Sequence, residues 1–369
     1  MKSQPGPSKV RIAYCGPVAR PGAPARGGYE AANRRLIDDL RLRGVAVLEL
    51  PYPLAVGALP VKALAYGLRF AAIAIALVQN RRRFDVLHLT PLYRQFLYAE
   101  ALLCLIAWGL GKRVLLDIRA GSFVRHYEDR GFFYRILADA LMRQADVLAL
   151  EGSEYLPFAQ ARRARPIVYL PNYVKLHSRQ RQSRGAEQGN SCIRIVFLSR
   201  VVPEKGVETA IGALEALQAM DVPARLEIIG TGDNRYVAAL AARVGNLPVA
   251  WSGPLAPEAV RARLAAAHFF VFPSRHRGEG HSNALTEAMA EGAVPVCSDA
   301  GFNKSVVGDA GRVLPAAAPA EDYARAIMEI GTGPNWQRLS QRARQRVALH
   351  FTGDVVLPDL IKSYHAAIV

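Results

Sequence analysis

Short apolar runs alternate with longer amphipathic segments along most of the chain. The runs have the length of strands, and the segments between them have the spacing of helices that bury one face. Strands are predicted at residues 10–16, 45–50, 84–90, 112–118, 146–150, 193–199, 225–230, 248–252, 268–273 and 294–297. Helices are predicted at residues 29–43, 60–83, 92–110, 131–144, 207–219 and 257–267. This alternation is typical of βαβ units, so we expect an α/β protein with doubly wound parallel sheets.

A polar segment interrupts the alternation near the middle of the chain. Residues 174–191 are charged and lack apolar periodicity, which is typical of a linker. The chain has 369 residues, enough for two α/β domains with a core each. We therefore predict an N-terminal domain at residues 1–172, a linker at residues 173–191 and a second domain at residues 192–350.

The formal net charge of +16 is concentrated in the first half of the chain. Residues 1–180 contain 27 Lys and Arg and 13 Asp and Glu, a net charge of +14, whereas residues 181–369 contain 20 and 18, a net charge of +2. This predicts an anionic partner for the first half only. Nucleic acid, an anionic membrane and a phosphorylated acceptor all carry the required charge. Nucleic acid is not favoured, because the chain has no helix-turn-helix, zinc-finger or RNA-binding motif.

The predicted helix at residues 60–83 is apolar through Leu64, Phe70 and Leu77 and ends in three arginines. A basic end on an apolar helix suits an anionic membrane surface. It equally suits a buried helix with cations near its carboxyl end. The strand that follows at once favours the buried helix, as in a βαβ crossover. The longest uncharged apolar run, residues 70–78, is shorter than the roughly 20 residues that span a bilayer.

The richest candidate chemistry lies at residues 272–299, which read FPSRHRGEGHSNALTEAMAEGAVPVCSD. A buried strand leads through a polar loop into a helix, whose first amides have no intrahelical partner and carry partial positive charge. Gly280 and the small side chains of Ser282 and Asn283 permit close approach of a ligand to these amides. Phosphate is the ligand that such a helix end is expected to bind.

Two glutamates flank this junction. Glu279 precedes the helix, within reach of a group attached to the phosphate. Glu287 lies one turn after Asn283 on the side away from the core, and a capping box on Asn283 would use Thr286 instead. A carboxylate in this position can accept hydrogen bonds from vicinal hydroxyls such as those of a ribose. A plain surface glutamate near a helix start is the alternative, since the helix dipole also favours it.

Two other loops carry groups suited to a diphosphate. Arg200 and Lys205 bracket a strand-to-helix turn, where two cations can hold a diphosphate between them. Gly27 and Gly28 directly precede the helix predicted at residues 29–43 and permit close backbone approach of an anion. Taken singly, both signals are weak: Arg and Lys are common at surface loop ends, and a plain turn explains the glycines better than an anion site does.

Glu279 and Glu287, with seven residues between them in EGHSNALTEAMAEGAVPV, resemble the Glu-x₇-Glu signature of the retaining glycosyltransferases of family 4. LSRVVPEKGVETAI, with Arg200 and Lys205, resembles the family's second signature, and RGGYEAANRRLIDDLRLRGVAV resembles its first loop and helix. The resemblance covers most of the second domain well and the first domain loosely. It implies the GT-B fold, with two Rossmann-like doubly wound domains facing each other across a cleft. It also implies a last helix, within residues 351–369, that crosses back to the first domain.

The resemblance implies a role for each matched residue. Glu287 would hold the nucleotide ribose and Glu279 the donor sugar, while Arg200 and Lys205 would neutralise the leaving diphosphate. The expected catalytic residues are therefore Glu279, Arg200 and Lys205. Backbone groups would complete the donor site, at Gly27, Gly28, Gly280, His281, Ser282, Asn283, Ala284, Gly230 and Leu255.

The acceptor side is expected in the first domain, at the carboxyl ends of its strands. Many family members have a histidine where this chain has Arg119, which can grip a phosphate or carboxylate but cannot act as a general base. We place Arg119, Ser122 and His88 on this side, and we interpret His88 as a structural histidine at a strand end.

We predict a glycosyltransferase that uses a UDP- or GDP-sugar and transfers the sugar to a glycan or a lipid-linked diphosphate. The basic first half fits a lipid-linked acceptor at a cytoplasmic membrane face, in the synthesis of a surface polysaccharide, lipopolysaccharide or glycolipid. Residues 1–9 show no signal peptide, so we expect a cytoplasmic protein, peripheral at the inner face of the cell membrane.

We expect no cofactor and no metal requirement. Two cationic side chains and a helix end already supply positive charge at the diphosphate, and no Asp-x-Asp follows a predicted strand. Two alternatives stay open. One is a GT-B sugar-nucleotide epimerase, and the other is a non-catalytic protein that binds a nucleotide sugar or nucleic acid.

Overall fold

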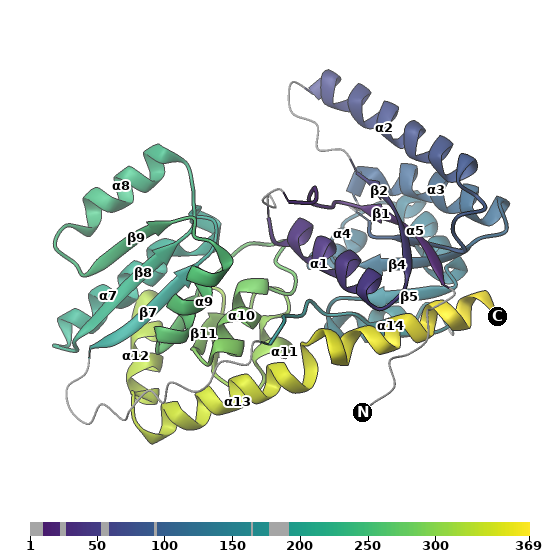
Figure 1. The fold of residues 1–369 in the computed structure, drawn as a ribbon. Coiled ribbons are helices and arrows are strands. Elements are labelled where there is room, and N and C mark those ends of the chain that lie inside the picture. The colour runs from purple at the N-terminus through teal and green to yellow at the C-terminus, as the bar shows by residue number, and fades with distance from the viewer. Residues whose placement is uncertain (1–9, 23–26, 53–58, 92–93, 164, 177–191) are drawn as a thin grey trace, which may run out of the picture. The chain divides into compact units, whose positions relative to one another are not determined.

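A computed structural model describes residues 10–22, 27–52, 59–91, 94–163, 165–176 and 192–369. The contacts of the chain separate two compact units, Met1–Asn172 with Gly353–Val369 as unit 1 and Tyr173–Thr352 as unit 2. Most of the expected linker, residues 177–191, lies outside the described residues, as do residues 23–26 of the first glycine-rich loop. Each unit is built on its own six-stranded parallel sheet (Figure 1).

The sheet of unit 1 has the strand order β2-β1-β3-β4-β5-β6. Its strands are β1 (Arg11–Gly16), β2 (Ala46–Pro51), β3 (Val86–Leu89), β4 (Arg113–Ile118), β5 (Val147–Leu150) and β6 (Ile167–Tyr169). Its helices are α1 (Gly28–Leu42), α2 (Leu59–Gln79), α3 (Leu97–Gly109), α4 (Phe123–Glu128), α5 (Phe132–Gln144), α6 (Leu156–Gln160) and α14 (Gly353–Ile368), with 3-10 turns at Arg94–Phe96 and Ser153–Tyr155. The central strands are buried almost throughout, as expected for parallel strands covered on both faces.

Helices cover both faces of this sheet because the chain changes direction at β1. It runs from β1 out to β2 through α1, and then back past β1 to β3, β4 and β5 through α2, α3 and α5. Right-handed crossovers therefore place α1 on one face and α2, α3 and α5 on the other. α2 packs against α3 (Figure 1). α3 packs against α5, and α14 packs against β3, β4 and β6.

The sheet of unit 2 has the strand order β12-β11-β10-β7-β8-β9. Its strands are β7 (Ile193–Leu198), β8 (Ala224–Ile229), β9 (Val249–Gly253), β10 (Phe269–Phe272), β11 (Val294–Ser298) and β12 (Arg312–Leu314). Its helices are α7 (Val207–Ala219), α8 (Asn234–Val244), α9 (Pro257–Ala266), α10 (Asn283–Glu291), α11 (Asn303–Val307), α12 (Ala320–Ile330) and α13 (Pro334–His350), with a 3-10 turn at Pro203–Lys205. The core lies between the sheet and α7 and α12, where Phe197, Phe269, Ile211 and Tyr323 are almost completely buried.

The α/β architecture with two doubly wound sheets is confirmed, but two strands were missed, and the helix expected at residues 60–83 differs in its end and in its burial. β6 and β12 have only three residues each, too few to show a pattern of their own. The helix expected at residues 60–83 ends at Gln79, so the three arginines follow it in a turn. That helix is also not simply buried, since Leu77 is 0% exposed but Leu64 is 65% exposed.

No helix in the described part of the chain combines the length and the apolar content needed to cross a membrane.

Candidate functional site

Two loops of unit 2 leave from neighbouring strands and then part. β7 and β10 pair in parallel, with Phe269 opposite Ile195. The chain connects β7 to β8 on one side and β10 to β11 on the other. The loops at residues 199–206 and 273–282 therefore diverge from one point of the carboxyl edge of the sheet. Ligands of doubly wound sheets bind at such a reversal point.

Gly206 allows the two loops to touch. Its φ of +77° is left-handed, and a Cβ atom there would lie 2.1 Å from the carbonyl oxygen of Pro273. Next to this contact, the amide of Arg275 donates a hydrogen bond to the carbonyl oxygen of Glu204, with an N–O distance of 2.8 Å. Because both the conformation and the close approach require glycine, Gly206 fixes the spacing of the two loops.

A buried ion pair joins the same loops. Nζ of Lys205 donates to Oε2 of Glu279 at 2.7 Å, and the Ser274 hydroxyl donates to the same oxygen at 2.6 Å. The side chains of Lys205 and Glu279 are only 10% and 9% exposed. The Ser298 hydroxyl donates to the carbonyl oxygen of Ser274 at 2.6 Å, which ties the loop to the end of β11. The structure thus brings two of the predicted catalytic residues into direct contact.

Further positive charge lies beside this pair. Arg200 is exposed. Partial burial and the nearby cations Lys205 and Arg200 lower the pKa of His276, which shows that Arg200 lies within electrostatic range of the second loop. An ammonium group has three N–H donors, and Glu279 accepts one of those of Lys205. Lys205 and Arg200 together can therefore still bind an anion at this edge.

The amino end of α10 lies at the end of the second loop. Ser282 caps the helix, and its hydroxyl accepts a hydrogen bond from the amide of Leu285 at 3.4 Å. The cap expected at Asn283 is therefore wrong by one residue, because Asn283 is already the first residue of the helix. Glu287 still lies outside a capping box, and the helix end keeps its partial positive charge. The predicted donor-site residues that are half-exposed here are Gly280, Asn283, Ala284 and Glu287.

The loop before α10 is held in place from its buried side. Nε2 of His281 shares a hydrogen bond with the hydroxyl of Thr286 at 2.6 Å, and the imidazole packs edge-on against Phe351. His281 can therefore offer a ligand its backbone but not its side chain. A Cβ atom at Gly301 would lie 2.2 Å from the carbonyl oxygen of Glu279, so the backbone that carries Glu279 is closely packed as well.

Gly230 and Leu255 follow the next two strands. A Cβ atom at Gly230 would lie 1.8 Å from the carbonyl oxygen of Ser199, and the amide of Gly230 donates to the carbonyl oxygen of Gly253 at 2.8 Å. The structure therefore packs Gly230 against the residue that precedes Arg200. Leu255 is half-exposed after β9, and no described contact joins it to the ion pair.

Unit 1 has its own reversal point, between β1 and β3. Gly27 and Gly28 are exposed at the start of α1. A larger residue would fit in place of Gly27, because a Cβ atom there would meet no atom within 4 Å. The Tyr29 hydroxyl donates to the carbonyl oxygen of Pro91 at 3.0 Å, which joins the start of α1 to the chain after β3.

Arg119 belongs to a buried polar network of unit 1. Its Nε donates to Oδ2 of Asp117 at 2.6 Å, and its Nη1 donates to Oδ1 of Asn172 at 2.8 Å. Nε2 of His88 lies 3.2 Å from the same Asp117 oxygen, and Nδ1 of His88 lies 2.5 Å from the hydroxyl of Tyr364 on α14. The network therefore ties the ends of β3 and β4 to the last helix.

Charge pairing sets the protonation of this network. Burial opposes ionisation of Asp117, but Arg119 and His88 outweigh it and lower the pKa of the carboxyl group. Burial and the nearby charge of Arg119 together lower the pKa of His88 by more than Asp117 raises it. His88, interpreted from the sequence as a structural histidine at a strand end, lies inside β3 and is fully buried. Ser122 is half-exposed at the start of α4.

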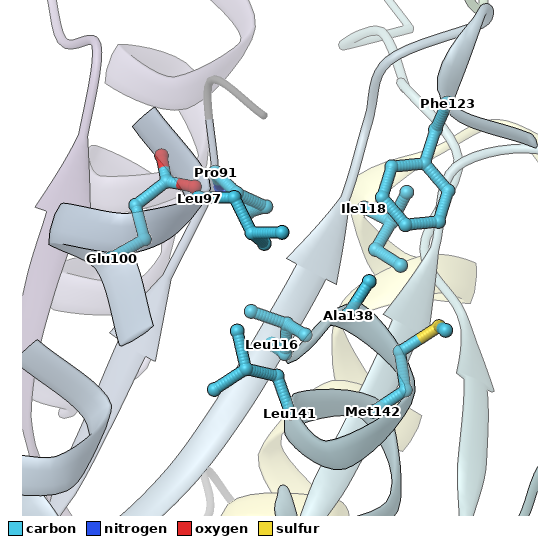
Figure 2. Close-up of a pocket in the computed structure, with 9 residues that line it drawn as sticks. All are labelled: Pro91, Leu97, Glu100, Leu116, Ile118, Phe123, Ala138, Leu141 and Met142. Atoms are coloured by element: carbon cyan, nitrogen blue, oxygen red, sulfur yellow. The ribbon is translucent and has the colours of Figure 1, made fainter. Parts of the chain in front are cut away.

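A small apolar pocket lies between α3, α5 and β4 of unit 1, as Figure 2 shows. Its lining residues are Pro91, Leu97, Glu100, Leu116, Ile118, Phe123, Ala138, Leu141 and Met142. Glu100 is the one ionisable group among them, and it is 1% exposed. None of the residues predicted to bind donor or acceptor lines this pocket.

The sequence patterns missed several polar residues of these networks. Ser274 and His276 directly follow β10, and their position after a strand end could have indicated them. Asp117 lies within an apolar strand, where a lone carboxylate could have indicated a buried partner. Tyr364 is far away in sequence and gave no signal. Within the described ranges, no three His, Cys, Asp or Glu side chains gather as metal ligands would.

Solved structures with a similar fold match between 80% and 97% of the chain. Sucrose-phosphate synthase from Thermosynechococcus elongatus is 18% identical with a TM-score of 0.74, and the match covers 97% of this chain and 99% of that one. HepE from Anabaena, in complex with UDP, is 14% identical with a TM-score of 0.68, over 97% and 100%. TarM from S. aureus is 13% identical with a TM-score of 0.59, over 80% of this chain and 59% of that one. These likenesses show that the chain has the GT-B fold.

A family comparison matches the part of the chain that contains both loops. Residues 192–332 match the family model described as Glycosyl transferases group 1. The matched segment runs from β7 to α12 and includes Arg200, Lys205, Glu279 and Glu287. No curated protein matches the chain.

Proposed function

We propose that the protein is a retaining glycosyltransferase of family 4, which transfers a sugar from a nucleotide sugar to a glycan or lipid-linked acceptor. The glycosyl transferases group 1 match over residues 192–332 supports glycosyl transfer. The observation that carries the proposal is the buried contact between Lys205 and Glu279. It joins the two loops that resemble the family signatures, at the point of the sheet where a ligand is expected to bind.

The proposed chemistry is stabilisation of a departing nucleoside diphosphate. Arg200, Lys205 and the amino end of α10 would supply positive charge where negative charge develops as the sugar–phosphate bond breaks. Glu279 would orient Lys205 and the sugar, and Glu287 would accept hydrogen bonds from the ribose. Because fixed cations supply the positive charge, we propose that turnover needs no metal ion.

UDP-sugars are the preferred donors in this proposal. The structures of HepE and TarM with a similar fold hold UDP. UDP-sugars and GDP-sugars share the ribose and the diphosphate and differ in the base, which lies at the end of the nucleotide away from the sugar. We therefore expect discrimination between UDP and GDP to arise near the ends of β8 and β9, where Gly230 and Leu255 lie.

The acceptor is proposed to be a lipid-linked diphosphate sugar, used in the synthesis of a surface polysaccharide, lipopolysaccharide or glycolipid by a cytoplasmic enzyme peripheral to the membrane. The net charge of +14 in residues 1–180 supports an anionic acceptor or surface for this half. Arg119, predicted on the acceptor side, lies near the ends of β3 and β4, but its charge is paired with Asp117 inside unit 1.

The test is turnover with a panel of UDP-, GDP- and ADP-sugars, measured as release of the nucleoside diphosphate. With an α-linked donor, NMR of the product should show an α-linked sugar, and turnover should persist in excess chelator. A β-linked product would contradict retention, and loss of turnover that Mg²⁺ or Mn²⁺ restores would contradict metal independence. Absence of hydrolysis and transfer with every donor, together with binding of UDP, would favour a binding protein.

A further inference from the structure

α2 of unit 1 has an apolar outer face. Its exposed apolar side chains are Val61, Leu64, Leu68, Ile75 and Val78, which are 58%, 65%, 64%, 56% and 44% exposed. Positions 61, 64 and 68 are spaced by three and four residues, and so are 68, 71, 75 and 78, where Ala71 completes the row. This spacing puts all of them on one side of the helix.

The neighbouring helices continue this face. On α3, Tyr98, Leu102 and Leu105 are 57%, 55% and 60% exposed and recur at the same spacing. On α5, Phe132 and Phe133 are 66% and 82% exposed. Because α2 packs against α3 and α3 packs against α5 on one side of the sheet, these residues share one layer. We call the outward side of this layer the apolar face.

The core of unit 1 does not account for the apolar face. The core is contacted by the opposite side of α2, where Phe70, Ile73 and Leu77 are 8%, 6% and 0% exposed. A surface helix of a globular domain normally presents polar residues on its outer side. A large apolar surface on several adjacent helices indicates a site of interaction with a partner or a membrane.

The charges beside the α2 and α3 part of the apolar face are positive. In residues 59–110 the basic residues are Lys62, Arg69, Arg81, Arg82, Arg83 and Arg94, and the acidic residues are Asp85 and Glu100. Asp85 is paired with Arg11 at 2.6 Å, and Glu100 is 1% exposed. The described residues of this segment therefore offer no unpaired exposed carboxylate. Arg81, Arg82 and Arg83 are exposed directly after α2.

The exposed apolar side chains and the arginines beside them together indicate which kind of partner binds the apolar face. In a symmetric dimer the same patch meets itself, which would set the arginines of one copy against those of the other. An anionic lipid surface offers both complements, because acyl chains accept the apolar side chains and phosphate headgroups accept the arginines.

We propose that the apolar face is a membrane-docking surface, on which α2 lies in the plane of an anionic lipid leaflet with Arg81, Arg82 and Arg83 at the headgroups. The inference deepens the peripheral location given in the proposed function. It does not depend on the donor site in unit 2, so the two can fail separately.

The first test is flotation of the purified protein with vesicles of phosphatidylcholine, with or without phosphatidylglycerol. The wild-type protein should float with the anionic vesicles. The double variant Leu64→Glu/Leu68→Glu should bind them at least about tenfold more weakly, because two carboxylates replace apolar contacts. The matched control Met328→Glu/Leu349→Glu changes two apolar residues of unit 2 that are 43% and 57% exposed, and it should bind as the wild type does.

The second test removes the charges. Replacing Arg81, Arg82 and Arg83 by glutamine should weaken binding to anionic vesicles on the order of 100-fold, since each basic residue contributes a factor of about five. Added salt should weaken wild-type binding in the same direction. On vesicles with brominated acyl chains, the fluorescence of the tryptophan introduced by Leu68→Trp should be quenched. The fluorescence of the tryptophan introduced by Leu349→Trp should not be quenched.

Several outcomes would overturn the proposal. One is wild-type binding to neutral vesicles that equals binding to anionic ones, and another is unchanged binding by the Leu64→Glu/Leu68→Glu variant. A third is a wild-type dimer in sedimentation that this variant converts to a monomer, because the face would then be covered by a second copy. UDP titration of each variant separates the two proposals, since UDP affinity should stay unchanged while vesicle binding is lost.

Discussion

The two units share a plan and differ in where they place their chemistry. Both are six-stranded parallel sheets with a reversal point at the carboxyl edge. In unit 2 the loops at that point are locked together by Gly206 and by the pair of Lys205 and Glu279. In unit 1 the distinctive feature lies on the outer surface of its helices, where apolar side chains face outward beside arginines. The comparison shows that the core fixes the inner sides of the helices, whereas loops and outer sides are free to specialise.

Each unit also contains a buried ion pair, and the two pairs differ in what they connect. Lys205 and Glu279 come from separate loops, so their contact shapes a site. Asp117 and Arg119 come from one strand end, and their network reaches the last helix through His88 and Tyr364. We therefore expect the first pair to act on donor binding and the second on the stability of unit 1.

The largest expected effect comes from breaking these pairs. Glu279→Ala should lower the free energy of unfolding by about 3–5 kcal/mol, because it leaves the ammonium of Lys205 buried without its partner. Asp117→Ala should destabilise unit 1 by a similar amount through the unpaired Arg119. Urea unfolding measures both effects. UDP titration should show lost affinity for the Glu279 variant and unchanged affinity for the Asp117 variant.

The double variant Lys205→Met/Glu279→Met is the control for this prediction. It removes both charges together and should recover most of the lost stability while turnover stays absent. A double variant as unstable as Glu279→Ala would show that packing, not the unpaired charge, causes the loss. Loss of UDP binding in the Asp117 variant would contradict the claim that the pair in unit 1 acts on stability and only the pair in unit 2 acts on donor binding.

Arg200 differs from the two buried pairs because it is exposed. Its loss should lower turnover without lowering the free energy of unfolding. Arg200→Ala should lower kcat about 100- to 1000-fold, as expected when a group that stabilises developing negative charge is removed. Its free energy of unfolding should change by less than about 0.5 kcal/mol, as for other surface substitutions. Steady-state kinetics with a donor, compared with Arg235→Ala on α8 as the matched control, measures the effect. Equal kcat values for the two variants would remove Arg200 from the site.

Gly206 tests whether the contact of the two loops is needed. Gly206→Ala should cost more than the roughly 1–2 kcal/mol of a left-handed residue, because its Cβ atom would also meet the carbonyl oxygen of Pro273 at 2.1 Å. Gly245→Ala is the matched control, since its φ is also positive at +55° but nothing lies within 4 Å. Thermal unfolding should show a lower stability for Gly206→Ala, and UDP titration should show a lower affinity for UDP. Gly245→Ala should change the affinity for UDP little. The same UDP affinity in both variants would show that the loops act independently.

The smallest expected effect is a pH dependence that originates in unit 1. Burial lowers the pKa of His88, so the unfolded chain, with an ordinary pKa of about 6.5, binds this proton more readily than the folded chain. The contribution to stability is complete above that value and is lost as the pH falls below it. His88→Gln should therefore flatten the decrease in unfolding free energy below about pH 6.5, by at most about 1.4 kcal/mol per pH unit. An unchanged slope, or the same flattening in the surface variant His350→Gln, would contradict this origin.

The sequence predicted the fold well, because buried parallel strands read as continuous apolar runs and their helices as periodic ones. It missed β6 and β12, whose three residues are too few to form a pattern. It also treated α2 as a buried helix, because Leu64 and Leu77 are equally apolar and only packing separates their exposures of 65% and 0%.

The candidate site was predictable where residues lie close in sequence to a strand end. The spacing of Arg200, Lys205 and Glu279 indicated their loops, but not that Lys205 and Glu279 pair with each other. The roles of Ser274 and Tyr364 depend on segments that meet only after folding. The sequence pattern does not distinguish a helix cap at Ser282 from one at Asn283, since both residue types are good caps.

Hydrogen–deuterium exchange with and without UDP tests the central claim most directly. If the loops that meet at β7 and β10 form the donor site, UDP should slow exchange at residues 199–206 and 273–287 and leave the amides of α2 and α3 unchanged. Saturable UDP binding with protection elsewhere, or with no protection of these two loops, would contradict the account.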